Sequence, residues 1–258
     1  MTQVAWLPHG RQVDPAQRTP LRAPTFIRVL ARLTQAEPRP SAASLSERLG
    51  QWIDWNHAVV LARALDGTPA VQPCPAAPHD DDSMSARARA ALAVDIADDP
   101  AWEAAIGTRG TAPGPQAAPH AAFASFQRRY LALQNAMQAT TGRLRGQLRD
   151  RLAATSAEMA RLADIDAAME RVLSPREHAL LGSVPGLLGR HFERMHHEVV
   201  AAREADTPPS PEARATADCL AAIRRDMQAV LLAELDVRFQ PIEALLAALR
   251  TPPQEPHA

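Results

Sequence analysis

The chain has 258 residues, of which about a fifth are alanine, 11 are glycine and only 4% are aromatic. A large β-sandwich or barrel needs many β-branched and aromatic residues and many glycine turns, so this composition excludes one. The formal net charge is −1, which gives no general attraction to nucleic acid or to an acidic membrane. Alanine, leucine and arginine favour helices, and the expected fold class is therefore all-α.

The N-terminal part of the chain divides at its prolines. Residues 1–23 contain Pro8, Pro15 and Pro20 and are expected to form a disordered tail without the apolar core of a signal peptide. A first helix is predicted over residues 25–35, with Phe26, Val29, Leu30 and Leu33 on its apolar face. Pro38 and Pro40 then end it, because proline lacks the backbone donor that a helix interior needs.

A second helix is predicted from Ser44 to Gly67. Ser44 and Glu47 have the spacing of a capping box, in which each side chain binds the other residue's backbone amide. Trp52 and Trp55 flank Asp54 within this helix. The preferred interpretation is that the two indoles are core anchors; the alternative is a platform that binds a ligand.

The next segment alternates linkers with a third helix. Residues 66–82 carry four prolines and end in the acidic run Asp80–Asp82, which predicts a Pro-rich linker with a solvated charge run. A helix is expected over residues 83–106, with Leu92, Ile96 and Trp102 facing inward. Residues 107–119 are expected to form a second linker, so that residues 24–106 make a small N-terminal helical unit.

Between Pro119 and Pro175 the chain contains no proline, and apolar or small residues recur about every 3.6 residues from Phe126 to Leu173. This spacing predicts one nearly straight helix of about 50 residues and roughly 75 Å. Its weak point is the stretch from Thr140 to Gly146, because each glycine costs about 1 kcal/mol against alanine inside a helix. Gly142 and Gly146 therefore mark a bend, a hinge or a close helix contact.

Two further helices complete the predicted bundle over residues 120–250. Ser174 and Pro175 have the residue types of a helix start, which predicts a helix over 174–205 interrupted near Pro185 and Gly186. Residues 206–211 are expected to be a tight connection before a last helix over 212–249, kinked at Pro241. The three helices are expected to pack antiparallel as an elongated bundle, followed by a disordered tail over 251–258.

No catalytic or cofactor motif occurs in the sequence. The absence of lysine rules out the lysine-containing phosphate loop and Schiff-base chemistry. The best metal candidate is the segment with His191, Glu193, His196, His197 and Glu198. Its histidines do not have the i, i+4 spacing that helical zinc sites use, so a solvated polar face is preferred. No catalytic, cofactor-binding or metal site is therefore predicted, and the protein is expected not to be an enzyme.

The arginines of residues 128–151 give an alternative function. Arg128, Arg129, Arg143, Arg145, Arg149 and Arg151 lie in this segment with one acidic residue, Asp150. They point in several directions around a helix, whereas a groove-binding helix places them on one face. Nucleic-acid binding is therefore the alternative, and pairing with the acidic residues of 80–103 or with a partner is preferred.

The long apolar face predicts self-association or a protein partner. The two later helices have fewer apolar positions than the long helix and are interrupted, so they are expected to leave part of it uncovered. That part is placed at Phe126, Tyr130, Leu133 and Met137, with Trp52 and Trp55 as further interface candidates. In the rival interpretation the N-terminal helices fold back, Trp52 and Ile53 cap the apolar face, and the protein is a compact monomer.

Two stretches resemble a bacterial family catalogued as domain of unknown function 3348. They are RLGQWIDWNHAVVLARAL at 48–65 and LSPREHALLGSVPGLLGRHFERMH at 173–196. The resemblance brings no site residues. It implies genes near those of a membrane-anchored coiled-coil protein and a peptidoglycan-binding protein similar to outer membrane protein A. It therefore implies a soluble helical component of an envelope-associated assembly.

Taken together, these observations predict a non-enzymatic structural or interaction protein that acts through helix–helix contacts. The longest apolar runs are about six residues, far short of the ~20 needed to cross a bilayer. Cys74 and Cys219 are too few for a disulfide framework and are expected to be free thiols in a reducing compartment. The expected location is therefore the cytoplasm, without membrane insertion, cofactor or small-molecule substrate.

Overall fold

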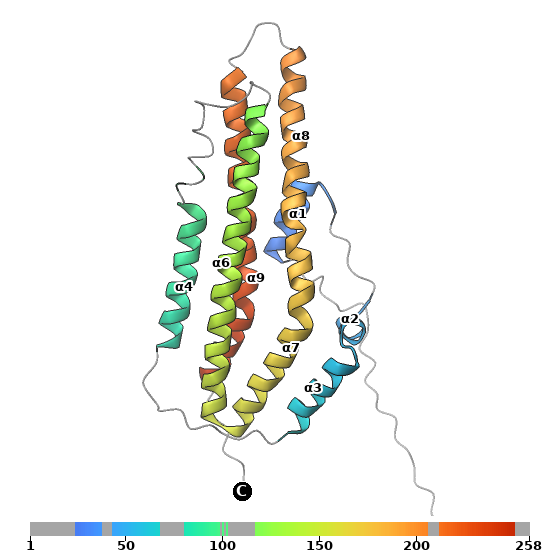
Figure 1. Cartoon of the computed structure of the whole chain (residues 1–258), viewed down its shortest axis with the longest axis vertical. Helices are drawn as coiled ribbons and strands as arrows, with labels where there is room; N and C mark the ends of the chain where they lie inside the picture. Colours follow the sequence, from blue (N-terminus) through green and yellow to red (C-terminus); the bar gives the residue numbers. More distant parts are fainter. Residues whose placement is uncertain are drawn as a thin grey trace, which may run out of the picture.

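The structure, a computed structural model, describes residues 24–37, 43–67, 80–98, 100, 102, 117–205 and 212–250, with backbone only at 117–119, 202–205 and 212–216. Within these ranges every regular element is an α-helix, which confirms the all-α class. The long helices are α6 (Ala117–Thr155), α7 (Ala157–Gly182), α8 (Val184–Ala205) and α9 (Glu212–Arg250). They form an elongated bundle. α8 continues from the end of α7, and these two helices together run alongside α6 and α9 (Figure 1).

The single long helix predicted through residue 173 is wrong, because the chain reverses at Ser156. Ser156 has an extended backbone, and its hydroxyl accepts a hydrogen bond from the Met159 amide at 3.2 Å, which starts α7. Arg145 on α6 pairs with Asp166 on α7, and these residues lie similar distances along the chain from Ser156. Only Ser156 separates α6 from α7, so the spacing of apolar residues continues almost unchanged from one helix to the next. The sequence pattern therefore gives no sign of the reversal.

The predicted helix start at Ser174 is also wrong, since Pro175 lies inside α7. Pro175 is exposed, so the Arg171 carbonyl that loses its helical donor lies toward solvent. α7 bends along its length (Figure 1), as an internal proline allows. The helix ends instead at Ser183, and α8 follows with Pro185 in its first turn. α9 confirms the last predicted helix and continues through Pro241.

The described N-terminal helices pack against the long helices of the bundle. α1 (Thr25–Thr34) lies against α9 and α8 and buries Phe26 and Leu33. α4 (Asp81–Ala97) lies against α9 and α6 and buries Leu92 and Ile96. α4 begins earlier and ends earlier than expected: Asp80 caps it, and Asp98 follows its last residue. Of the expected linkers, 68–79 and 107–116 lie outside the described residues, as do 103–106 of the expected third helix, both tails and Cys74.

The acidic run of residues 80–82 is structural and not simply solvated. Asp80 accepts a hydrogen bond from the Ser83 amide, while Asp81 pairs with Arg151 at 3.1 Å and Asp82 pairs with Arg250. These contacts join the start of α4 to the ends of α6 and α9. They also confirm, for Arg151, the expected pairing of the arginine-rich segment with the acidic one.

The predicted helix from Ser44 to Gly67 divides into α2 (Leu45–Trp52) and α3 (Trp55–Asp66). The capping box of Ser44 and Glu47 is confirmed. The helix breaks because Asp54 accepts a hydrogen bond from the His57 amide at 2.8 Å and caps α3. Neither helix has a fully buried residue, and α3 lies against α7. Trp55 is 81% exposed, so its assignment as a core anchor is wrong; Trp52 is half-buried.

The apolar face at the start of α6 is core and not an uncovered surface. Phe126, Tyr130 and Met137 are fully buried within the single chain, and Leu133 is nearly so. Trp102 covers Phe126, with ring centroids 5.5 Å apart, and donates a hydrogen bond to the Ile96 carbonyl. The N-terminal helices do fold back, as the rival interpretation requires, but Trp102 and α4 cover this end of the face.

The glycines at the predicted weak point have no close neighbour. α6 is continuous through Gly142 and Gly146, and a Cβ atom added at either would meet nothing within 4 Å. The close helix contact that was one of the three expectations is therefore not found among the described residues. A hinge at Gly142 and Gly146 stays a prediction.

Candidate functional site

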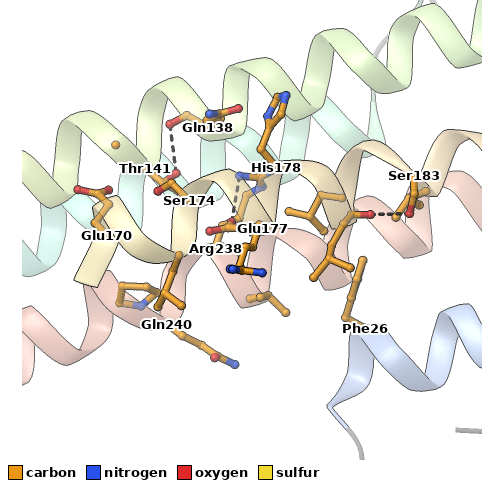
Figure 2. A pocket seen from close by; sticks show the side chains of 18 of the residues that line it. Phe26, Gln138, Thr141, Glu170, Ser174, Glu177, His178, Ser183, Arg238 and Gln240 are labelled. Carbon is orange, nitrogen blue, oxygen red and sulfur yellow. Dashed lines mark hydrogen bonds and ion pairs between the residues drawn. The ribbon is translucent and has the colours of Figure 1, made fainter. Parts of the chain in front are cut away.

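One edge of the bundle is open. α6 packs against both α7 and α9, and α8 packs against α9, whereas α7 and α9 hardly approach each other over their described residues. A cavity of about 750 Å³ lies between these two helices, and Figure 2 shows it from close by. We call it the α7–α9 groove. Its lining comes from α1, α2, α6, α7, α8 and α9.

Helix α1 closes one end of the α7–α9 groove. Phe26, Ile27 and Leu30, in its first two turns, belong to the lining, and the helix then continues against α9 and α8. In Figure 2, Phe26 lies at the end of the groove that is next to α1. A short amphipathic helix thus covers part of this side of the bundle, and the groove lies at its N-terminal turns.

The walls of the groove are largely apolar and partly open to solvent. Leu180 on α7 is 68% exposed and Ile27 on α1 is 42% exposed, while Trp52 and Val237 are half-buried. All four side chains line the groove. Large apolar side chains that gather at a solvent-open groove are typical of a binding surface, whereas isolated ones are not.

A buried polar network extends from two groove residues, Arg238 and Glu177, into the core. Glu234, which has no exposed surface, accepts hydrogen bonds from the Tyr130 hydroxyl at 3.2 Å and from the Gln134 amide at 2.9 Å. Its other carboxylate oxygen accepts from Arg238, whose guanidinium also reaches Glu177 at 3.3 Å. Figure 2 shows Arg238 and Glu177 pointing toward each other. The Arg238–Glu177 ion pair therefore spans the groove from α9 to α7.

Burial also affects Tyr130 itself. Its pKa lies well above the ordinary value, first because burial disfavours the phenolate and second because the Glu234 carboxylate is next to it. Tyr130 thus remains a neutral hydrogen-bond donor. Gln134 also donates to the Leu181 carbonyl at 3.2 Å, which fixes the end of α7 against α6.

A second charged cluster closes the α6–α7 side. The Arg145 guanidinium makes two hydrogen bonds to Asp166, of 2.6 and 2.8 Å, and reaches Glu170 at 3.5 Å. Arg149 binds Glu170 at 2.5 Å. Burial disfavours the charged form of Arg145, but the contact with Asp166 outweighs it and raises the arginine's pKa. Both carboxylates of this cluster are therefore already neutralised by arginine.

At the rim of the groove, Arg176 on α7 lies over the indole of Trp52 on α2, with its guanidinium carbon 5.0 Å from the ring centroid. Both residues line the groove. Trp52 thus has the position of a stacking platform, which sequence reasoning considered as the alternative to a core anchor. The contact also joins the two stretches, 48–65 and 173–196, that carry the family resemblance.

The histidine-rich segment of α8 is divided among separate contacts. His191 lies 2.9 Å from Asp226, while Glu193 pairs with His120 at 3.4 Å and the His196 ring packs against the His120 ring. Over the described residues no group of three or more histidine, cysteine or acidic side chains is arranged to hold a metal ion.

The arginine-rich segment does not form a free basic face. Arg145, Arg149 and Arg151 are each in ion pairs with acidic residues of α7 or α4, as described above. Arg128 donates to the Ser125 hydroxyl, and Arg129 also has a partner. Arg143 is exposed and is the member of this set without a partner in the described part of the chain.

Sequence reasoning missed Glu234, Arg238 and Arg176. Glu234 lies within the apolar run of α9, at a position next to Leu235, and Arg238 follows one helical turn later. An acidic residue one turn before an arginine in an apolar helix could have indicated a buried ion pair. The same spacing is common on exposed helix faces, so it does not distinguish the two. The placement of Trp52 beside Arg176 has no local signal.

Comparison with known proteins identifies the family. A family model described as "Protein of unknown function (DUF3348)" matches residues 13–251. No curated protein and no solved structure matches the chain. Among the described residues, no helix has the length and apolar character needed to cross a membrane. Because the family model covers nearly the whole chain, the protein belongs to the DUF3348 family.

Proposed function

We propose that this protein is a non-enzymatic interaction protein that binds an amphipathic helix of a partner protein in the α7–α9 groove. The observation that carries the proposal is the open edge of the bundle. The α6–α7, α6–α9 and α8–α9 edges are packed, while the α7–α9 edge holds a cavity of about 750 Å³ with exposed apolar walls. Apolar grooves between helices are a recurrent way of binding amphipathic helices.

Helix α1 indicates what kind of segment this side of the bundle accepts. Phe26, Leu30 and Leu33, at positions i, i+4 and i+7, face the bundle, while Arg28 and Arg32 are exposed. Only the first two turns of α1 line the groove, and the rest of this helix lies against α8 and α9. A partner helix with the same apolar spacing would continue the α1 position along α7 and α9.

A photo-crosslinking experiment tests the proposal. A photoreactive phenylalanine analogue at position 180 is irradiated in cells, and the crosslinked peptide is mapped by mass spectrometry. We expect a discrete partner peptide with apolar residues at i, i+3 or i+4, and i+7. The substitution Leu180→Arg should reduce the amount of co-purified partner at least tenfold, because it places a charge on the apolar wall.

Leu131→Arg is the matched control, since Leu131 is an exposed leucine at 42% on α6 and does not line the groove. Both variants should remain folded by circular dichroism. Crosslinks from position 180 to a second copy of this chain would mean that the groove mediates self-association and does not bind a different partner. Equal loss of the partner in both variants, or a crosslinked peptide without helical apolar spacing, would refute groove binding.

The proposed role includes the expected location. A cytoplasmic protein that serves an envelope-associated assembly should fractionate with the soluble material when expressed alone and should shift to the membrane fraction only with its partner. Recovery in the membrane fraction of cells that lack the crosslinked partner would contradict this part of the proposal.

A further inference from the structure

We infer that the partner helix presents a side-chain carboxylate to Arg176, which Trp52 holds in position at the rim of the α7–α9 groove. This inference rests on the proposed function and specifies the chemistry of the partner. It is carried by the cation–π pair of Arg176 and Trp52, by the absence of an ion pair to Arg176 among the described residues, and by the pairing of the other charges that line the groove.

Arg176 differs from the other arginines that line the groove. Arg145 is bound by Asp166 and Glu170, and Arg238 is bound by Glu234 and Glu177. Arg176 is exposed, and its guanidinium lies over the indole face of Trp52 without an ion pair or hydrogen bond to another described residue. Its N–H groups therefore have no protein acceptor in that part of the chain.

Stacking on an indole prepares a guanidinium for carboxylate recognition. A guanidinium over an indole face is held by a cation–π contact, and its N–H donors remain able to bind both oxygens of a carboxylate. Such two-bond, charge-assisted pairs are about twice as strong as neutral hydrogen bonds and are directional. The stack also reduces the side-chain freedom that Arg176 would lose on binding.

The remaining charges favour an acidic partner over a basic one at this point. Glu170 and Glu177 are the acidic residues of the lining, and each already accepts from an arginine. A lysine or arginine of the partner would have to compete with Arg149 or Arg238 for them. A glutamate of the partner would find Arg176 without a competing carboxylate from the described part of the chain.

Model helices test the inference directly. Three fluorescein-labelled helical peptides with blocked ends have leucines at the apolar spacing of α1, which is i, i+4 and i+7. They differ at one position next to a leucine, which is glutamate, glutamine or lysine. Fluorescence anisotropy with the full-length protein measures their dissociation constants. We expect the glutamate peptide to bind about tenfold more tightly than the glutamine peptide, and the lysine peptide to bind most weakly.

Variants of the pair assign this preference. Arg176→Ala should make the glutamate and glutamine peptides bind equally. Arg176→Lys keeps the charge but loses the planar fork, so it should retain only part of the preference. Trp52→Leu keeps an apolar wall and removes the stacking surface, and it should also reduce the preference. Arg87→Ala, at an exposed arginine on α4 away from the groove, should leave it unchanged.

The outcomes separate the inference from the proposed function. If glutamate and glutamine peptides bind equally and Leu180→Arg abolishes both, the carboxylate inference is wrong and groove binding stands. If the preference survives Arg176→Ala, Arg176 is not the carboxylate receptor. If no peptide binds, or if Leu180→Arg changes nothing, helix binding in the groove is itself refuted.

Discussion

Glu234 and Arg238 form an ion pair one helical turn apart within the core, with Arg238 Nη2 2.8 Å from Glu234 Oε1. The glutamate side chain is fully buried and the arginine side chain is 8% exposed. Each needs the other, because an isolated charge in this position would have lost its hydration without compensation. The pair connects α9 to α6 through Tyr130 and Gln134, and to α7 through Glu177.

The first prediction concerns this pair. Glu234→Ala should lower the free energy of unfolding by about 3–5 kcal/mol, because the Tyr130 hydroxyl loses its acceptor and the buried Arg238 and Gln134 each lose one of two acceptors. Denaturant unfolding followed by circular dichroism measures the change. Glu243→Ala is the control: it removes an exposed partner of Arg89 and should cost less than about 1 kcal/mol. Equal effects would show that the buried network is not specially important.

The second prediction uses Tyr130, which is the only tyrosine in the chain. An unfolded tyrosine ionises near pH ~10, but in the fold burial and then Glu234 raise the pKa of Tyr130. Above pH ~10 the native state binds more protons than the unfolded state, so its stability should fall as the pH rises. Phenolate absorbance near ~295 nm should appear only as helicity is lost. Phenolate formation in a fully helical protein near pH ~10 would contradict this.

The third prediction separates core from interface on α6. Phe126→Arg should unfold the bundle, because Phe126 is fully buried against Trp102 and even its truncation to alanine would cost about 3–5 kcal/mol. Leu131→Arg, on the same helix but 42% exposed, should leave helicity and the melting temperature nearly unchanged. Circular dichroism melts and light scattering measure both. If the Phe126→Arg protein stays helical and light scattering shows a lower molecular mass than for the wild type, the interface interpretation would be restored.

The fourth prediction concerns Gly142 and Gly146. Because an added Cβ meets nothing within 4 Å at either position, the double alanine variant should stabilise the full-length protein by about 1–2 kcal/mol through helix propensity. Denaturant unfolding gives the sign. A loss of stability would mean that a neighbouring helix needs these glycines. Unchanged stability together with lost partner binding would favour a functional hinge.

The fifth prediction concerns the arginine-rich segment. Arg145→Ala with Arg149→Ala should lower stability by about 1–3 kcal/mol, since Asp166 and Glu170 are partly buried and lose their charged donors. The wild-type protein should show little salt-dependent retardation of DNA or RNA, because these arginines are already paired. Tight binding that weakens steeply with salt, and that the double variant loses, would support the nucleic-acid alternative.

The sequence determined the all-α class, the positions of α1 and α9, and most of the residues that face the core. It also determined the capping box of Ser44 and the inward positions of Leu92, Ile96 and Trp102. These features are local: a period of 3.6 residues identifies the apolar side of a helix, and a cap depends on residues three apart. The family resemblance likewise followed from the sequence.

Only the tertiary structure decided where the chain reverses and which edge of the bundle stays open. Periodicity identifies a helix face but not its direction in space, so the reversal at Ser156 and the continuation through Pro175 were both predicted wrongly. Burial of Phe126 depends on Trp102, and burial of Glu234 depends on Tyr130, Gln134 and Arg238. The stack of Arg176 on Trp52 joins residues far apart in sequence, and it forms because α3 packs along α7.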